Sequence, residues 1–361
     1  MPIKLNYIKA IFPGVVLALV FCLFSQGINN VLAIEIFNTP KSPISTVLIA
    51  ILLGILMGNA FTPRPGMMIG LDFTQQYILK LGIIFLGIRL SFADLIKFGS
   101  IAIPLVIFCI VGVLILIKLL IKKVPISSKM SYLIAIGTSV CGATAIVATA
   151  PVINAKKTEV AYAIANITLF GVIAMLVYPY FAEWYFDNNS IEAGLFLGTS
   201  IHETSQVAAA GLIYDQQFNN PETLDVATVT KLIRNTFLVI LIPLFAFLYN
   251  RGEIRDQKYS IFNIFPYFVL GFIGMIIVRN LGDQFFSIEN NNFYIWSKFI
   301  EYLKILATVF LTMAMAAVGI SINLSELKSM GYKPFIVGLI AAVTVGIISL
   351  VYIETVKNFL F

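Results

Sequence analysis

The chain has 361 residues, of which 59% are hydrophobic and 12% are charged, and its formal net charge is +6. A soluble domain has about 25% charged residues, and a globular fold of this length must keep a large surface in contact with water. The composition therefore excludes a water-soluble enzyme and a disordered chain. It also argues against a nucleic-acid-binding protein, which would need a clustered basic face. An all-α polytopic membrane protein remains.

Apolar segments long enough to cross a bilayer, which takes about 20 helical residues, recur along the chain. The first follows Lys4 and Lys9, and we expect a retained signal-anchor helix because no small-residue cleavage site follows it. No long polar stretch separates the segments, so residues 1–361 are expected to form a single integral membrane domain. The candidate membrane segments are 10–33, 45–60, 77–92, 101–121, 128–152, 157–182, 191–214, 225–249, 261–280, 298–322 and 334–354.

Two of these segments, 128–152 and 191–214, are rich in Gly, Ala, Ser and Thr. Such stretches suit helices buried inside a bundle, or helices that break and line a cavity. Lysines flank both ends of the first segment and carboxylates flank both ends of the second. Because cytoplasmic loops carry the Lys and Arg excess, the pattern predicts that both segments are re-entrant, the first from inside and the second from outside.

This arrangement gives nine full crossings and two re-entrant elements, with a cytoplasmic N-terminus and an external C-terminus. Lys97 and Lys357 fall on the wrong side of the membrane in this scheme. The basic residues that it places inside are Arg64, Lys122, Lys123, Lys129, Lys156, Lys157, Arg251, Arg255, Lys258, Lys328 and Lys333.

Two pairs of internal repeats are visible. GIRLSFADLIKFG matches GISINLSELKSMG, and GTSVCGATAIVATA matches GTSIHETSQVAAAG. The repeats extend over 87–121 with 319–354 and over 137–182 with 198–249. An odd number of predicted crossings separates the partners of each pair, so both pairs are expected to be inverted. Inverted repeats with a broken helix in each half are typical of secondary transporters.

The sharpest candidate site is His202-Glu203, which contains the only histidine of the chain. Ionisable residues inside a membrane segment usually line a pathway or bind an ion. Gln206 lies one helical turn further on and shares their face. The segment lacks the second histidine that a metalloprotease motif requires.

Hydroxyl groups and a glycine mark the two broken segments, at Thr138, Ser139 and Gly142 in the first and at Thr199 and Ser200 in the second. Broken helices offer unpaired N–H groups and a positive dipole end, which together form an anion site. Their carbonyl ends would equally hold Na⁺. The alternative for each of these residues is a role in tight helix packing alone.

Lys231 and Arg234 lie one turn apart on the next segment. We expect them to snorkel to the outer interface, and the sharper alternative is that they attract an anion toward the site. Arg89 is expected to pair locally with Asp94 or to snorkel. The Gly-x-x-x-Gly spacings at 54–58 and 194–198 are interpreted as helix contacts.

Four motifs, CGATAI, HETSQVAAAG, KLIRN and GIRLSFADL, together resemble the YeiH-type family of bacterial inner-membrane proteins, which is labelled as sulfate exporters. The similarity runs over nearly the whole chain. The family motif HEVAQV is replaced here by HETSQV, so Thr204 and Ser205 are more polar than usual. The resemblance implies a bacterial inner-membrane transporter with two inverted repeats, a scaffold domain and a moving core.

The expected function is secondary active transport of a small anion, sulfate or a sulfonate-like oxyanion, by alternating access. Thr138, Ser139, Gly142, Thr199, Ser200 and Gln206 would bind the anion, and His202 and Glu203 would carry coupling to H⁺ or Na⁺. We expect no enzymatic activity and no cofactor, and the sequence contains no ATPase motif. Na⁺ is the one candidate metal ion, and a homodimer is a candidate assembly.

Three other functions are compatible with a membrane protein of this kind. The first is a Na⁺-coupled organic-anion symporter or a cation/proton antiporter, in which Glu203 would be a cation ligand. The second is a membrane sensor or assembly subunit that binds a ligand without moving it. An intramembrane hydrolase has little support, because the only acid–base pair lacks a nucleophile.

Overall fold

The computed structural model describes residues 5–39, 42, 44–61, 65–120, 127–249, 265–286, 293–323 and 332–360. These residues form helices joined by short turns, with no strand among them, so the expected all-α fold is confirmed. Some of the residues on which the predictions depend lie outside the described ranges. They are Arg64, Lys122, Lys123, Arg251, Arg255, Lys258, Lys328 and positions 324–331, which belong to the repeat at 319–354.

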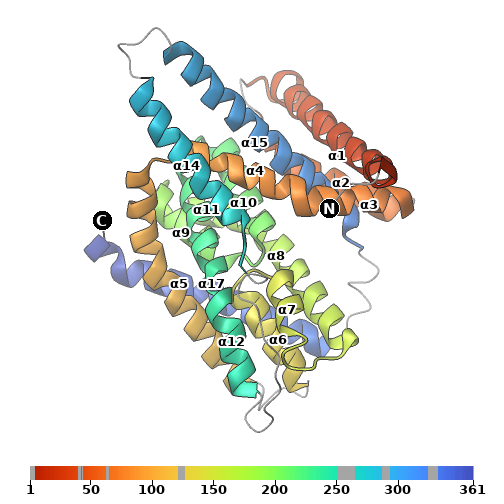
Figure 1. Cartoon of the computed structure of the whole chain (residues 1–361), viewed down its shortest axis with the longest axis vertical. Helices are drawn as coiled ribbons and strands as arrows, with labels where there is room; N and C mark the ends of the chain where they lie inside the picture. The colour runs from red at the N-terminus through yellow and green to blue at the C-terminus, as the bar shows by residue number, and fades with distance from the viewer. Residues whose placement is uncertain are drawn as a thin grey trace. The chain divides into compact units, whose positions relative to one another are not determined.

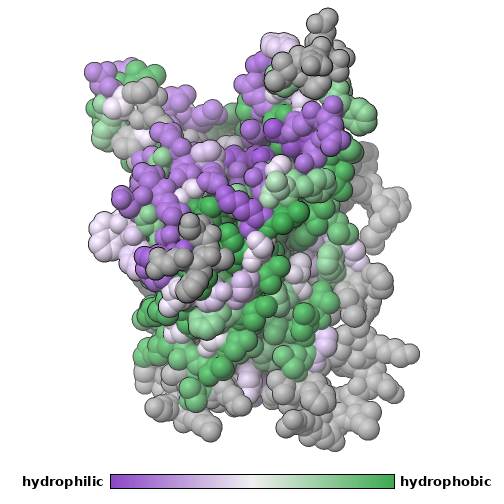
Figure 2. Space-filling view, turned by 90° about the vertical axis from the view of Figure 1, so that its left-hand side faces the viewer, coloured by the Kyte–Doolittle hydropathy of each residue, from purple (hydrophilic) through white to green (hydrophobic). Residues whose placement is uncertain are grey.

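Within the described ranges, eight helices are long and apolar enough to cross a membrane, and Thr46–Ala60 is a shorter apolar helix. Large hydrophobic side chains such as Phe12, Phe24 and Ile240 are exposed on these helices. Figure 2 shows hydrophobic residues (green) covering a continuous area of one face. A surface of this kind is suited to lipid rather than to water. The numbers of crossing and re-entrant segments stay predictions.

The chain divides into two compact units (Figure 1). Unit 1 comprises residues Met1–Asp94, Leu212–Pro221 and Phe268–Leu324. Its helices are α1 (Leu5–Val31), a π-helical turn (Leu32–Ile36), α2 (Thr46–Ala60), α3 (Pro65–Phe73), a second π-helical turn (Thr74–Ile78), α4 (Leu79–Leu86), a 3₁₀ turn (Gly87–Arg89), α14 (Phe268–Phe285) and α15 (Phe293–Ser321).

Unit 2 comprises residues Leu95–Gly211, Glu222–Tyr267 and Ser325–Phe361. Its helices are α5 (Phe92–Leu120, from Leu95 on), α6 (Ser128–Ser139), α7 (Ala143–Thr149), α8 (Lys157–Phe186), α9 (Ser190–Ser200), α10 (Thr204–Phe218, as far as Gly211), α11 (Pro221–Thr236, from Glu222 on), α12 (Leu238–Tyr249) and α17 (Tyr332–Leu360).

Glycines bring helix backbones together in unit 1. Gly54 of α2 lies against the backbone of Ala316 and Gly319 in α15, and Gly58 lies against Ile320. Glycine lacks the Cβ that would hold the two backbones apart. The first Gly-x-x-x-Gly spacing is therefore a helix contact, as expected.

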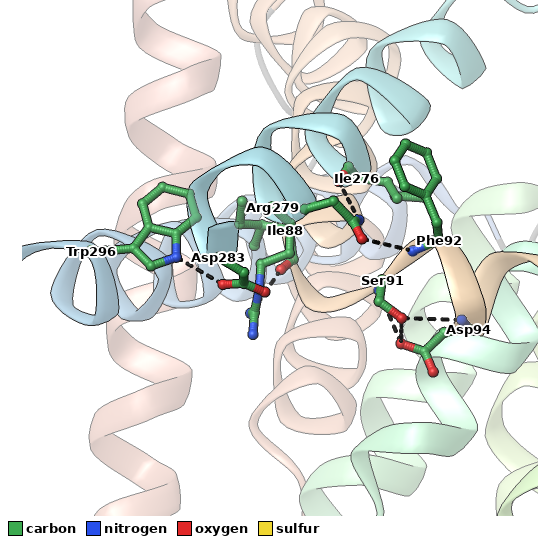
Figure 3. A network of polar contacts seen from close by, with 9 residues as sticks. Ile88, Ser91, Phe92, Asp94, Ile276, Arg279, Asp283 and Trp296 are labelled. Atoms are coloured by element: carbon green, nitrogen blue, oxygen red, sulfur yellow. Dashed lines mark hydrogen bonds and ion pairs between the residues drawn. The ribbon is translucent and has the colours of Figure 1, made fainter. Parts of the chain in front are cut away.

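A polar network holds the end of α4 in unit 1 (Figure 3). Asp283 of α14 accepts from Trp296 Nε1 at 2.8 Å and from Arg279 Nε at 2.6 Å. Arg279 also donates to the carbonyl of Ile88 at 3.3 Å. The 3₁₀ turn after α4 is thereby tied to α14 and α15.

Arg89, which follows in the same turn, makes longer-range contacts than the expected pairing with Asp94. It forms an ion pair with Asp215 at 3.6 Å and donates to the carbonyl of Pro221 at 3.1 Å. Asp94 caps α5 instead, since its carboxylate accepts from the backbone N–H of Ser91 at 2.9 Å and from its hydroxyl at 2.7 Å.

In unit 2, α8 and α17 each pack against both α6 and α9. Helix α9 also lies close to α11, because Gly194 faces Thr223 and Val226, and Gly198 faces Thr230. The second Gly-x-x-x-Gly spacing is thus a contact with α11. This packing places α11 beside the end of α9 at which the second small-residue segment is interrupted.

Candidate functional site

The first small-residue segment is interrupted between Ser139 and Ala143, where α6 ends and α7 begins. Val140 leaves the helical region at φ −127° and ψ −91°. Gly142 then adopts φ +71° and ψ −129°, a conformation that is essentially restricted to glycine. Glycine at this position therefore permits the interruption.

The second small-residue segment is interrupted between Ser200 and Thr204, where α9 ends and α10 begins. Ile201 is extended, at φ −90° and ψ +141°. The backbone N–H of Glu203 donates to Gln206 Oε1 at 3.2 Å, as in a helix N-terminal capping box. The sequence His202-Glu203 thus lies in the connection between two half-helices.

The residues that flank each interrupted segment contact each other in unit 2. Ser127, before α6, donates to the carboxylate of Glu159, after α7, and Lys129 donates to the carbonyl of Asn154 at 2.7 Å. Ser190, at the start of α9, donates to the carboxylate of Glu222, after α10. A segment that crossed a bilayer completely would separate its ends by about 30 Å. The geometry agrees with re-entrant segments, and both the re-entrant paths and the inverted relation of the two segments stay predictions.

Lys231 joins the two interruptions. Its side chain is 0% exposed, and Nζ donates to the carbonyls of Val140 and Ile201 at 2.9 Å each and to the carbonyl of His202. The first carbonyl belongs to the first interruption and the other two to the second. One ammonium group therefore holds three acceptors from two separate parts of the chain.

Arg234, one turn further along α11, makes the same connection. It is also 0% exposed. Nε donates to the carbonyl of Ser139 at 2.7 Å, one terminal nitrogen donates to Thr199 at 2.6 Å and Ile201 at 3.1 Å, and the other donates to Thr138. The acceptors are carbonyls at the ends of both α6 and α9.

The two cations thus stand where two helix dipoles end. Helices α6 and α9 both finish here, and their last carbonyls carry partial negative charge with no intrahelical donor. The expected snorkelling of Lys231 and Arg234 is wrong, because both heads bind buried carbonyls rather than water. The sequence shows that no carboxylate lies within a turn of either residue on α11, but it does not show which groups bind the two cations.

The residues around these helix ends include buried polar atoms that have no hydrogen-bond partner among the described residues. The hydroxyls of Thr138, Ser139 and Ser200 and both ring nitrogens of His202 are in this group. All four side chains are at most 1% exposed. Because buried polar groups are nearly always paired with protein, water or ligand, these unpartnered atoms make the two interruptions the candidate ligand site.

Glu203 connects the starts of the second half-helices. Its carboxylate accepts from the backbone N–H of Ala143, the first residue of α7, and from Thr168 Oγ1 of α8 at 3.4 Å. Gln206 Nε2 donates to the carbonyl of Thr168 at 3.3 Å. A Cβ at Gly142 would strike the Glu203 side chain. Thr168 was not among the residues singled out in the sequence.

Thr199 differs from the other hydroxyl residues. Its Oγ1 donates to the carbonyl of Leu195 at 2.7 Å and lies 2.7 Å from Ser349 Oγ of α17. Asn235 of α11 donates to Thr204 Oγ1 at 2.9 Å. These contacts fix α9 and α10 to their neighbours, and the sequence alone did not point to Ser349 or Asn235.

Within the described residues, no group of three or more His, Cys, Asp or Glu side chains lies close enough to hold a metal ion. The site that the structure assembles is therefore made of helix ends, two cations, one carboxylate, one imidazole and several hydroxyls. Among the predicted residues it brings together Thr138, Ser139, Gly142, Thr199, Ser200, His202, Glu203, Gln206, Lys231 and Arg234.

Comparison with known proteins gives consistent matches. A family model described as Conserved hypothetical protein 698 matches residues 13–338. A UPF0324 membrane protein of Streptococcus agalactiae serotype V is 35% identical over 303 residues, covering 83% of this chain and 86% of the relative. One of Fusobacterium nucleatum is 34% identical over 323 residues, covering 88% and 91%. One of Clostridium tetani is 28% identical over 357 residues, covering 95% and 96%. No solved structure matches the chain.

Proposed function

The chain belongs to the UPF0324 family of membrane proteins, and from that premise we propose that it is a secondary active transporter of a small anion. This family is the YeiH-type family that the sequence motifs resemble, so that resemblance is confirmed. The proposed cargo is sulfate or a sulfonate-like oxyanion, moved by alternating access across a bacterial inner membrane, with the N-terminus in the cytoplasm.

One observation carries the proposal: Lys231 and Arg234 bind the carbonyl ends of both interrupted helices. These cations offset the negative ends of α6 and α9. The nearby carboxylate is that of Glu203, which accepts a hydrogen bond from the backbone N–H of Ala143 at the start of α7. Two cations balance one carboxylate and the partial negative charge of two helix ends, so this buried place carries no excess negative charge that would repel an anion.

The unpartnered side chains supply the contacts that such an anion needs. The hydroxyls of Thr138, Ser139 and Ser200 can each donate a hydrogen bond to the anion, and His202 can donate from one ring nitrogen when neutral and from both when protonated. The imidazole is also suited to carrying a coupling proton. In the proposed cycle, Glu203 shares that coupling role, and Gln206 positions Glu203.

The Na⁺-coupled alternative has less support from this geometry. A sodium ion at the helix ends would need carbonyl oxygens, and those of Thr138, Val140, Ile201 and His202 already accept from Lys231 or Arg234. A cation placed there would also meet two positive side chains. The anion proposal uses the same charges without conflict.

Flux measurements on the purified protein in liposomes test the proposal. We expect uptake of labelled sulfate that depends on an imposed pH gradient and is lost in His202→Ala. Sulfate-independent flux that requires Na⁺ would instead establish the cation-coupled alternative. Stabilisation of the protein against heat by an anion, without flux of that anion, would identify a sensor and contradict transport.

A further inference from the structure

The surroundings of Lys231 Nζ resemble those of a bound ion. Three carbonyl oxygens approach the ammonium, those of Val140 and Ile201 at 2.9 Å each and that of His202. The side chain that delivers the charge is fully buried. Rings of carbonyl oxygens that replace a hydration shell are how proteins bind monovalent cations inside membranes.

An ordinary helix C-cap does not explain this arrangement. A capping lysine binds successive carbonyls at the end of one helix, whereas Lys231 takes its acceptors from two segments about 60 residues apart in the chain. Ile201 is extended and Val140 has left the helical region, so both backbones turn away from helix geometry as they meet the ammonium. The oxygens converge on a point and not along a helix axis.

We propose that the carbonyls of Val140, Ile201 and His202 form a monovalent-cation site whose cation is the chain's own Lys231 ammonium. A free Na⁺ or ammonium ion takes this place once the lysine side chain is removed. With the lysine present, its ammonium occupies the site and Na⁺ does not bind there. The inference bears on the coupling ion of the proposed transporter, but it holds whether or not the protein moves an anion.

Thermal unfolding of purified Lys231→Ala in chloride salts of Na⁺, K⁺, NH₄⁺ and N-methyl-D-glucamine, at one ionic strength, tests the proposal. We expect the variant to be stabilised by a small cation, with a saturating rise of the unfolding midpoint by several degrees over the large organic cation. The wild type, whose site is filled, is expected to show no difference between the salts.

Lys129→Ala is the matched control, because Lys129 Nζ also donates to a backbone carbonyl, that of Asn154 at 2.7 Å, but near the surface and with one acceptor. This variant is expected to behave as the wild type does in every salt. If it shows the same cation-specific rise as Lys231→Ala, the effect does not come from the three-carbonyl site and the proposal is overturned.

Lys231→Ser provides a second variant, with a hydroxyl in place of the ammonium. The proposal is also overturned if neither variant is stabilised by any small cation, or if no cation recovers folded protein from either variant. Cation-specific stabilisation without sulfate flux in the wild type would leave this inference standing and remove the proposed function. Sulfate flux in the wild type, without cation-specific stabilisation of the variants, would support the proposed function and overturn this inference.

Discussion

Arg234 Nε donates to the carbonyl oxygen of Ser139 at 2.7 Å, although the two residues are 95 positions apart in the chain. Ser139 is the last residue of α6, and the same guanidinium reaches Thr199 near the end of α9 at 2.6 Å. Helix α11 is therefore the element that holds the two interrupted helices together. Through these contacts, the ends of α6 and α9 lie at the same place.

Arg234→Ala is expected to lower the free energy of unfolding by about 3–5 kcal/mol, because it breaks a buried, charged hydrogen-bond network. Arg234→Lys should recover only part of the loss, since one ammonium cannot reproduce the planar fork of a guanidinium. Denaturation of the purified protein in detergent measures both changes.

Lys298→Ala is the control for this series, because Lys298 pairs with Glu301 at an exposed position of α15. Loss of an exposed ion pair costs at most about 1 kcal/mol. Equal losses for Arg234→Ala and Lys298→Ala would contradict the account of Arg234 as the connection between the two helix ends.

Gly142→Ala is expected to destabilise the protein by about 1–3 kcal/mol, because φ is +71° at this position and glycine alone adopts the conformation without strain. The new Cβ would also strike the Glu203 side chain. Gly274→Ala is the matched variant, in the interior of α14, where no heavy atom lies within 4 Å of the added Cβ. It should stabilise by about 0.5–1 kcal/mol. Changes of the same sign at both positions would show that the backbone of Gly142 is not strained.

The re-entrant path that is predicted for the first segment implies a labelling pattern. Cysteines placed at Ser128 and Lys157, which lie exposed at the two ends of the segment, should react with a membrane-impermeant thiol reagent from the same face of the membrane. The bond between Ser127 and Glu159 is the reason, since it joins these ends. Labelling from opposite faces would mean that the segment crosses the bilayer.

The sequence predicted the membrane class, the two interruptions and most of the side chains that lie at them, because each depends on local composition. Gly142 and the hydroxyls of Thr138 and Ser200 could be found in this way. The partners of Lys231 could not, since its acceptors are backbone carbonyls and these leave no mark in a sequence. An isolated Lys and Arg in an apolar segment suggested snorkelling, and only the fold shows that the ends of α6 and α9 lie within their reach.

The contact between Thr199 and Ser349 could not be foreseen for a similar reason. The two residues are 150 positions apart, and nothing in α17 distinguishes Ser349 from other serines in apolar helices. Its consequence is that the Thr199 hydroxyl already has partners, whereas those of Thr138 and Ser200 have none among the described residues. Tertiary packing thus separates hydroxyls that look equivalent in the repeated GTS motif.

The most direct test of the central claim, that hydroxyls at the interruptions hold a transported anion, compares two buried threonines that both lack a partner among the described residues. Thr138 lies at the end of α6 and Thr149 at the end of α7, away from the interruption. Each is replaced by valine, which removes the hydroxyl and keeps the shape, and labelled sulfate flux is measured per folded protein in liposomes. The account predicts that Thr138→Val loses most of the flux and that Thr149→Val retains it. Equal flux in the two variants, or no sulfate flux in the wild type, would contradict the account.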